Sequence, residues 1–317
     1  MRCFVTGLTG FAGGYLGNYL NSQGAKVLGI GLNVPPIKAP FETIQCDLLN
    51  IGELRRLITG FQPEYIYHLA ALSNPSESFT RPLEYYHSNL NGTLNLLEVV
   101  RKHSNHTKLL LVSSCQVYGK TSKELLNEDS PIRPQNPYAS SKWLGERAAL
   151  QYHKNFGTRV VISRPFNHSG PGQVESFVVS SFCKQIATIE KEASQSNKES
   201  GVIFVGNLRS TLDFLDVRDV VRAYADLAIK GVEGEIYNVC SSEPTEIQQI
   251  LDLAKELTKV EIEVQVSQER LRIGKHERLV GDNKKLRLCC EWSPRYKLNQ
   301  TVADTLNSWR IQINKGS

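Results

Sequence analysis

The chain has 317 residues, of which 40% are hydrophobic and 22% charged, and a formal net charge of +5. This length suits one large α/β unit or a core with an appended lobe, and charges of mixed sign without a basic block argue against a nucleic-acid partner. Because no apolar run approaches the roughly 20 residues that cross a bilayer, and seven scattered cysteines predict reduced thiols, we expect a cytoplasmic protein that binds no membrane.

Short apolar runs alternate with helical patterns through the first half of the chain. The run at 3–6 predicts the first strand, and apolar spacing over 11–22 predicts the first helix. Alternation of this kind favours an α/β fold with a parallel, doubly wound sheet of the Rossmann type, whose ligand loops lie at the carboxyl ends of the strands. The further strands that we expect are 26–30, 43–46, 65–69, 108–113 and 158–163.

The second half changes character after the polar stretch 191–200, which predicts a surface loop or the end of a helix. We expect a smaller C-terminal α/β lobe that closes over a cleft and binds the substrate. The expected elements here are helices at 177–189, 217–229, 244–259 and 298–313 and a strand at 235–240. The predicted dinucleotide-binding domain comprises 1–166 with about 207–240, and the predicted substrate lobe comprises about 167–206 with 241–317.

A glycine-rich turn connects the first expected strand to the first expected helix. Gly7, Gly10 and Gly13 form a G-x-x-G-x-x-G pattern. Glycine suits these places because side chains would keep a pyrophosphate away from the backbone N–H groups at the helix N-terminus. The position of the pattern between a strand and a helix therefore predicts a dinucleotide site.

The end of the second expected strand is where the choice between NAD and NADP usually shows. An acidic residue there holds the ribose 2′-hydroxyl of NAD, whereas an arginine accommodates the 2′-phosphate of NADP. This chain has Gly31, Leu32 and Asn33 at that point, so neither signal is present. The missing acid slightly favours NADP over NAD.

Tyr138 and Lys142 form a Y-x-x-x-K pattern at the start of an expected helix, directly after Pro137. The spacing puts both side chains on one helix face, where the ammonium favours the phenolate and lowers the tyrosine pKa from about 10. Ser114 ends the fifth expected strand and can hydrogen-bond a reacting carbonyl or hydroxyl. These three side chains are the predicted catalytic residues.

Several motifs together resemble those of the extended short-chain dehydrogenases/reductases, and the resemblance runs nearly from end to end. The resemblance implies hydride transfer between a nicotinamide cofactor and a nucleotide-linked sugar. It also implies a homodimer formed through helices 82–103 and 137–156. The motifs are the glycine turn, Asp47, HLAA at 68–71, N-x-x-G-T-x-N at 89–95, SSCQVYG at 113–119, Tyr138 with Lys142, and EWSP at 291–294.

By the same resemblance, Asp47 contacts adenine, residues 70–73 pass beside the cofactor diphosphate and ribose, and Asn89 supports the active site. His168 faces the nicotinamide ribose. We expect no metal, since the seven histidines are dispersed. The predicted cofactor contacts are Gly7, Gly10, Phe11, Ala12, Gly13, Leu32, Asp47, Leu48, Leu69, Ala70, Ala71, Asn89, Val112, Tyr138, Lys142, Pro165 and His168.

Three further segments, 164–173, 177–189 and 205–219, are most similar to GDP-4-dehydro-6-deoxy-mannose reductases, with GDP-mannose 4,6-dehydratases as near relatives. The likeness implies that Asn167 lies on the sugar diphosphate and that Lys184 and Arg272 are candidates for the nucleotide side. The predicted substrate contacts are Ser73, Ser114, Asn167, Lys184, Arg209 and Arg272.

Gln116 distinguishes between the reaction classes. A dehydratase removes a proton with a carboxylate two positions after its active-site Ser or Thr, and an amide cannot act as that base near pH 7. Cys115 and Gln116 follow Ser114 here, so the sequence favours a reductase of a nucleotide-linked 4-keto-6-deoxyhexose. A 4-epimerase or an unusual 4,6-dehydratase with a retained cofactor stays open, as does a dinucleotide-binding regulator without activity.

Two departures from the family pattern concern the nucleotide. Leu212 stands where an arginine usually precedes Asp213 and Phe214, and Arg209 is the candidate to supply the missing charge. Lys275 stands where the family has a glutamate that holds the nucleotide ribose. We favour GDP as the nucleotide.

Overall fold

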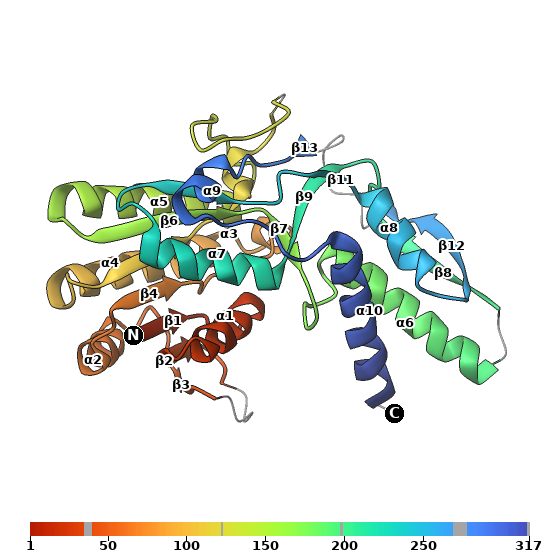
Figure 1. Cartoon of the computed structure of the whole chain (residues 1–317), viewed down its shortest axis with the longest axis horizontal. Coiled ribbons are helices and arrows are strands. Elements are labelled where there is room, and N and C mark those ends of the chain that lie inside the picture. The colour runs from red at the N-terminus through yellow and green to blue at the C-terminus, as the bar shows by residue number, and fades with distance from the viewer. Residues whose placement is uncertain (35–39, 122, 197–198, 269–277, 316–317) are drawn as a thin grey trace.

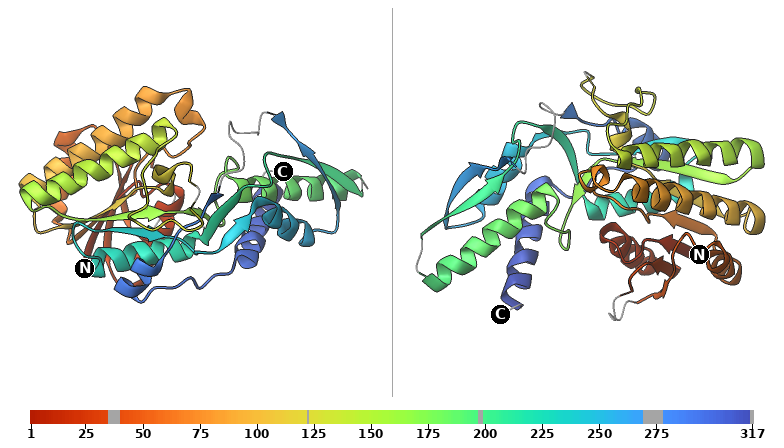
Figure 2. Two further views of the ribbon diagram at one scale, coloured as in Figure 1. Left: turned by 90° about the horizontal axis from the view of Figure 1, so that it is seen from above. Right: turned by 180° about the vertical axis from the view of Figure 1, so that it is seen from behind.

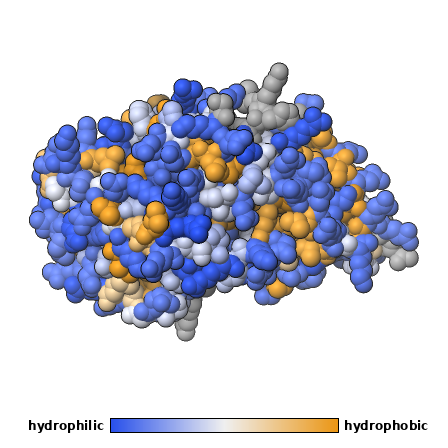
Figure 3. All heavy atoms as spheres, turned by 45° about the horizontal axis from the view of Figure 1, so that its top comes forward, coloured by the Kyte–Doolittle hydropathy of each residue, from blue (hydrophilic) through white to orange (hydrophobic). Residues whose placement is uncertain are grey.

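The computed structural model describes residues 1–34, 40–121, 123–196, 199–268 and 278–315, so the predicted site residue Arg272 lies outside the described residues. The chain forms a larger lobe that holds the N-terminus and a smaller lobe that holds the C-terminal helix (Figure 1, Figure 2). The face drawn in Figure 3 is mainly hydrophilic, with apolar side chains in separate small groups. No described helix is both long and apolar enough to span a membrane.

The larger lobe is built on a parallel sheet of seven strands in the described part of the chain. The strand order is β10-β6-β5-β4-β1-β2-β3, so the direction of winding reverses between β1 and β4. Strand β5 is buried along its whole length, as expected when helices cover both faces of a sheet. The strands are β1 (Arg2–Thr6), β2 (Lys26–Gly31), β3 (Glu42–Gln45), β4 (Tyr65–His68), β5 (Lys108–Val112), β6 (Arg159–Pro165) and β10 (Ile236–Val239).

Helices cover both faces of this sheet (Figure 2). They bury apolar side chains against it. The two helical layers confirm the predicted doubly wound α/β fold. One layer consists of α1 (Phe11–Ser22), α7 (Val217–Lys230) and α9 (Lys284–Cys290), and the other of α2 (Ile51–Phe61), α4 (Gly92–His103) and α5 (Pro137–Phe156). Between β4 and α4 lie the short helical segments η1 (Glu77–Phe79), α3 (Pro82–Tyr85) and η2 (Tyr86–Asn91), of which α3 and η2 run directly into α4, and η3 (Cys115–Tyr118) follows β5.

The smaller lobe has an apolar core of its own, which its three long helices share with a two-stranded sheet. A second small sheet, centred on β9, faces the larger lobe. The helices are α6 (Val178–Ser196), α8 (Ile247–Glu256) and α10 (Leu298–Lys315). The strands are β7 (Asn167–Ser169), β8 (Ser200–Val205), β9 (Thr211–Asp216), β11 (Pro244–Glu246), β12 (Glu261–Val266) and β13 (Arg278–Leu279).

The helix expected over 244–259 begins later than the sequence pattern predicts. Its first three expected residues instead form β11, antiparallel to β9. Pro244 has no backbone N–H, which an edge strand tolerates. The helix starts at Ile247 because the side chain of Gln249 accepts a hydrogen bond from the backbone N–H of Glu246 at 3.0 Å, a helix-capping contact.

The range 207–240, expected in the dinucleotide-binding domain, is shared between the two lobes. Strand β9 pairs with β7, β11 and β13, whereas α7 and β10 belong to the larger lobe. The buried side chain of Trp292 also packs in the core of the larger lobe. The division of the chain into two domains stays a prediction.

Candidate active site

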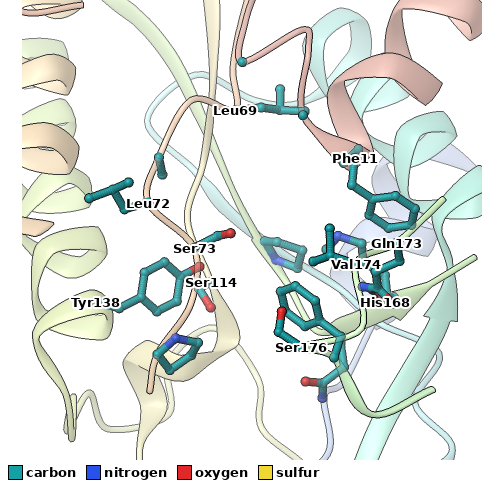
Figure 4. Close-up of a pocket in the computed structure, with 18 of the residues that line it drawn as sticks. Phe11, Leu69, Leu72, Ser73, Ser114, Tyr138, His168, Gln173, Val174 and Ser176 are labelled. Carbon is teal, nitrogen blue, oxygen red and sulfur yellow. Dashed lines mark hydrogen bonds between the residues drawn. The ribbon is translucent and has the colours of Figure 1, made fainter. Parts of the chain in front are cut away.

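A cavity of about 1440 Å³ lies along the carboxyl ends of the strands. Gly7, Leu69 and Ser113, which directly follow β1, β4 and β5, line it. The segment 173–179 and strand β9 line it from the other side, as Figure 4 shows for Gln173, Val174 and Ser176. Strand ends at the switch point of a doubly wound sheet are where such folds bind ligands, so both lobes contribute to one candidate site.

The glycine turn leaves its backbone open toward this cavity. Gly7 has a φ of +74°, and a Cβ there would lie 2.7 Å from the backbone nitrogen of Ala70. A Cβ on Gly13 would lie 2.0 Å from the carbonyl oxygen of Gly7, so larger residues are excluded at both positions. Gly10 has no side chain to cap α1, and the N–H groups of the first helical turn can therefore bind a phosphate. The turn thus fits the diphosphate of a dinucleotide.

The three predicted catalytic residues lie together in the cavity. Tyr138 and Lys142 are on successive turns of α5, and the helix begins where Asn136 accepts a hydrogen bond from the backbone N–H of Ala139 at 2.7 Å. Ser114 follows β5, and its hydroxyl interacts with the phenol of Tyr138 in a way that favours the phenolate. The Tyr138 ring points into the cavity toward this serine (Figure 4).

Burial shifts the pKa of Tyr138 in the direction opposite to the one expected from the sequence. Its pKa is raised to about 12, because desolvation disfavours the phenolate more than the interaction with Ser114 favours it. Lys142 is buried as well, and its own pKa falls to about 8, against the opposing effect of the Glu146 carboxylate. The expected net lowering of the Tyr138 pKa is therefore wrong for this structure, because burial outweighs the effects that favour the phenolate, and the tyrosine keeps its proton at neutral pH.

A buried ion pair holds the catalytic helix against the sheet. Glu146, one turn after Lys142, pairs with Arg164 of β6 at 2.7 Å, and their side chains are 1% and 4% exposed. The same carboxylate accepts a hydrogen bond from Ser113 at the end of β5. Removing either partner would leave a buried charge uncompensated, so this pair fixes α5 relative to β5 and β6.

His168 lies near the glycine turn and stacks on Phe11, with ring centroids 6.2 Å apart and an interplanar angle of 6°. Its Nδ1 is 3.0 Å from the carbonyl oxygen of Phe166, so this nitrogen donates the hydrogen bond. Burial lowers the pKa of His168, which favours the neutral imidazole with a free acceptor on Nε2.

Gln116 lines the cavity beside Ser114 and supplies an amide, not a carboxylate. Among the described lining residues, Asp47 and Glu175 are the carboxylates. Asp47 lies beside Cys46 just after β3, close to the end of β2. Glu175 is engaged by Lys184 at 2.8 Å. No described lining carboxylate therefore stands where a dehydratase carries its base.

Most of the predicted site residues line this one cavity, although their individual roles stay predictions. Those that line it are Gly7, Gly10, Phe11, Ala12, Gly13, Leu32, Asp47, Leu48, Leu69, Ala70, Ala71, Ser73, Val112, Ser114, Tyr138, Lys142, Pro165, Asn167 and His168.

Three described candidates are not among the lining residues. Asn89 is buried behind the wall, where its amide pairs with the backbone of Leu72. The Nζ atom of Lys184 pairs with Glu175 and lies 5.3 Å from the ring centroid of Trp309. Arg209 is exposed on the turn before β9. The cavity as described thus has Lys142 as its only Lys or Arg.

Much of the cavity wall that the smaller lobe provides was not predictable from sequence patterns. These side chains come together only through the tertiary fold, and the one local signal is the turn Gly170-Pro171-Gly172, just before the segment that begins at Gln173. The missed lining residues include Thr9 in the glycine turn of the larger lobe and, in the smaller lobe, Gln173, Val174, Glu175, Ser176, Phe177, Phe182, Asn207, Phe214 and Ile247.

The chain matches known proteins over almost its whole length. The family model described as GDP-mannose 4,6 dehydratase matches residues 4–305. The chain is 33% identical to a GDP-6-deoxy-D-mannose reductase of Pseudomonas aeruginosa over 99% of both proteins. It is 31% identical to a GDP-6-deoxy-D-talose 4-dehydrogenase of Aggregatibacter actinomycetemcomitans over 90% of both.

Solved structures agree with this assignment. The structure of RMD from Pseudomonas aeruginosa complexed with NADPH has a TM-score of 0.84 and 33% identity, covering 98% of this chain and 99% of that one. A putative epimerase from Burkholderia cenocepacia has a TM-score of 0.86 and 30% identity, covering 98% of each chain. The protein therefore belongs to the GDP-mannose 4,6-dehydratase family of extended short-chain dehydrogenases/reductases.

Proposed function

We propose that this protein reduces the 4-keto group of a nucleotide-linked 4-keto-6-deoxyhexose, as a step in deoxysugar biosynthesis. The observation that carries the proposal is the cluster of Ser114, Tyr138 and Lys142 in the cavity, with the amide of Gln116 in place of an elimination base. The similarity to a GDP-6-deoxy-D-mannose reductase over nearly the whole chain supports the same reaction.

NADP is the cofactor that we favour over NAD. A related structure is described as complexed with NADPH, and β2 ends at Gly31 without an acidic residue after it. The glycine turn and the first turn of α1 would hold the diphosphate, and Asp47 and Leu48 the adenine end. When bound, the reduced nicotinamide supplies a hydride to the carbonyl carbon of the sugar.

Tyr138 is the proton donor in this proposal. Because burial raises its pKa to about 12, the phenol is protonated at neutral pH and can give a proton to the oxygen that becomes negative during reduction. Ser114 hydrogen-bonds the same oxygen and stabilises its charge. Lys142 lies one helical turn away, and its cationic form favours the tyrosinate that remains after proton transfer.

Tyr138→Phe tests the proposal, since it removes the donor hydroxyl and keeps the ring. We expect the variant to bind NADPH with unchanged affinity and to lose about 10²–10⁴-fold in kcat with a 4-keto-6-deoxy sugar nucleotide. Tyr152→Phe is the matched control, because Tyr152 is on the same helix but hydrogen-bonds Glu98 at 3.2 Å, outside the cavity lining. Equal kcat for wild type and Tyr138→Phe would contradict the proposal.

The consumption of NADPH separates reduction from the alternatives. A reductase oxidises NADPH in step with product, whereas a 4-epimerase or a 4,6-dehydratase returns the hydride that it takes. We expect the loss of NADPH absorbance to match the product measured by chromatography. Product formed without loss of NADPH would replace the reductase with one of these redox-neutral reactions.

GDP is the nucleotide that we propose. In this proposal Ser73 contacts the substrate, Asn167 lies on the sugar diphosphate, and Lys184, Arg209 and Arg272 are the candidates for the nucleotide side. A thermal-shift panel of GDP, UDP, CDP and dTDP sugars in the presence of NADPH tests this. A true ligand at 100 times its Kd stabilises by about 2.7 kcal/mol, so we expect the GDP sugar to give the largest shift. A larger shift with another nucleotide would contradict the choice of GDP.

The protein is also proposed to form a homodimer through the helices expected at 82–103 and 137–156. Helices α4 and α5, with the helical segments α3 and η2 that lead into α4, pack side by side on one face of the larger lobe. Leu83 of α3 is 82% exposed there. An exposed leucine beside two packed helices suits a self-complementary contact between two copies.

A further inference from the structure

A chain of hydrogen bonds runs behind the cavity from the segment after β4 to the start of α5. We call residues 69–73, which all line the cavity, the strap. At the centre of the chain is His68, the last residue of β4, which is 1% exposed. Its Nδ1 lies 2.8 Å from the hydroxyl of Thr6 on β1, and its Nε2 lies 2.9 Å from the hydroxyl of Thr93 on α4.

The hydroxyl of Thr93 sets the direction of these hydrogen bonds. It donates its proton to the carbonyl oxygen of Asn89 at 2.7 Å, so it must accept from His68, whose Nε2 therefore carries a proton. Burial lowers the pKa of His68 to about 3, and the charge of Lys142 on α5 acts in the same direction. The ring is therefore neutral, and its Nδ1 accepts a hydrogen bond from Thr6.

This network of hydrogen bonds reaches both walls of the reactive site. On one side, the backbone N–H of Ala70, in the strap, donates to the threonine hydroxyl of β1 at 3.2 Å. Toward α5, the amide of Asn89 accepts from the backbone N–H of Leu72, which is also in the strap, at 2.8 Å and donates to the hydroxyl of Ser141 at 2.9 Å. Ser141 in turn donates to the backbone carbonyl of Tyr138 at 2.8 Å. One network thus joins the strap to the helix of the proton donor.

We propose that His68 is a positioning residue, which holds the strap and Tyr138 at a fixed separation through its neutral Nε2–H tautomer. The inference rests on the proposed function, because the strap is the backbone along which the cofactor is proposed to lie. A displacement of 1 Å between reacting groups can cost about 10²-fold in rate, so a rigid link between the two walls has a direct catalytic value. A histidine that only satisfied its own hydrogen-bonding groups would not couple them.

The tautomer is tested by nitrogen-15 NMR of histidine-labelled protein, with the His68 signals assigned by their loss in His68→Gln. We expect a protonated Nε2 and an unprotonated Nδ1, and no titration of this ring from about pH 6 to about pH 9. A proton on Nδ1, or a ring that titrates in this interval, would overturn the proposal. This measurement uses the wild-type fold and needs no active variant.

The coupling is tested with Thr6→Val and Thr93→Val, which remove the hydroxyl on each side of the imidazole. We expect each variant to lower kcat at saturating substrates on the order of tenfold. The double variant should lose no more than the more impaired single variant, because both substitutions break the same route through the imidazole and leave the route from Leu72 through Asn89 to Ser141 in place. Thr93→Ser keeps a hydroxyl and should restore kcat. Losses that multiply in the double variant would overturn the proposal.

Thr158→Val is the matched control. Thr158 is equally buried, but its hydroxyl has no hydrogen-bond partner in the described part of the chain. We expect wild-type kcat, and a loss as large as that of Thr93→Val would show general destabilisation and overturn the proposal. If the wild-type protein reduces no keto sugar, the proposed function fails. The His68 tautomer and a weaker NADPH affinity in Thr6→Val, on the order of tenfold, would then still support the coupling.

Discussion

At the scale of single residues, Lys142 is the clearest case of a side chain that lowers the stability of the fold but is needed for activity. Its side chain is 8% exposed, and burial lowers its pKa to about 8, while Glu146 on the next turn opposes the shift. A buried ammonium lowers the free energy of unfolding whenever it is charged. Proteins keep such groups where the chemistry needs them, and the side chain faces the same cavity as Tyr138.

Lys142→Met should therefore abolish turnover and stabilise the protein at pH 7. The folded pKa of about 8 lies below the ordinary value of 10.5, so the unfolded chain binds more protons between these values and wild-type stability rises with pH through this window. Below this pH window the buried ammonium is fully charged, and it lowers the free energy of unfolding of the wild type by roughly 3 kcal/mol. Urea unfolding without dinucleotide should give the variant a higher free energy of unfolding than wild type at pH 7. The difference between the two proteins should shrink toward pH 10.

The exposed Lys154, on the same helix, supplies the control for this prediction. Lys154→Met should leave both the stability and its pH dependence unchanged, because a solvated ammonium has little penalty to relieve. A Lys142→Met protein less stable than wild type at pH 7 would mean that the ammonium stabilises the fold.

At the scale of elements, the unit β1–turn–α1 shows how backbone geometry makes a binding site. Gly7 needs its positive φ to turn the chain, and Gly13 packs against the carbonyl of Gly7 so closely that no Cβ fits. Gly14, the next residue of α1, has its nearest neighbour 4.0 Å from an added Cβ. Two adjacent glycines in one helix therefore have opposite tolerance for a methyl group.

Gly13→Ala should push the turn out of shape, lower the stability and weaken NADPH binding at least about tenfold, since a side chain there blocks the approach of a phosphate. Gly14→Ala should keep the affinity and gain about 0.5–1 kcal/mol of stability, because alanine restricts the unfolded chain and favours the helix. Calorimetric titration and thermal unfolding check both variants. Equal affinity in both would show that the turn does not hold the cofactor.

At the scale of the whole molecule, the two lobes are joined by polar contacts beside the cavity. The hydroxyl of Tyr15 on α1 donates to the carbonyl of Pro171 at 2.8 Å. Arg218, at the start of α7, pairs with Asp216 of β9 and with Asp304 of α10, each at 2.7 Å. The cavity wall of the smaller lobe is thus tied to the larger lobe on the side away from α4 and α5.

The dimer proposal predicts that Leu83→Glu weakens self-association, because a carboxylate would have to lose its water in the contact. Sedimentation velocity should show wild type as a dimer and the variant shifted toward monomer. Leu288→Glu is the matched control, since Leu288 is 76% exposed but belongs to α9, on the opposite face of the sheet. A monomeric wild type, or equal shifts in both variants, would contradict the proposed interface.

Features encoded by short spacing were predictable from the sequence. The strands and helices of the larger lobe, the glycine turn and the grouping of Ser114, Tyr138 and Lys142 all follow from patterns within a few residues and from the way strand ends converge. The strand at Pro244–Glu246 was not, because its pairing partner, β9, lies about 30 residues earlier in the chain.

Local order in the chain was thus sufficient for the sheet, the dinucleotide turn and the choice of reacting side chains, because each depends on covalent neighbours. Only the tertiary structure decided the protonation of Tyr138 and Lys142 and the link from His68 to both walls of the cavity. Those properties depend on how much water the packed lobes exclude and on which distant groups they bring within hydrogen-bonding distance. Neither can be predicted from the spacing of residues along the chain.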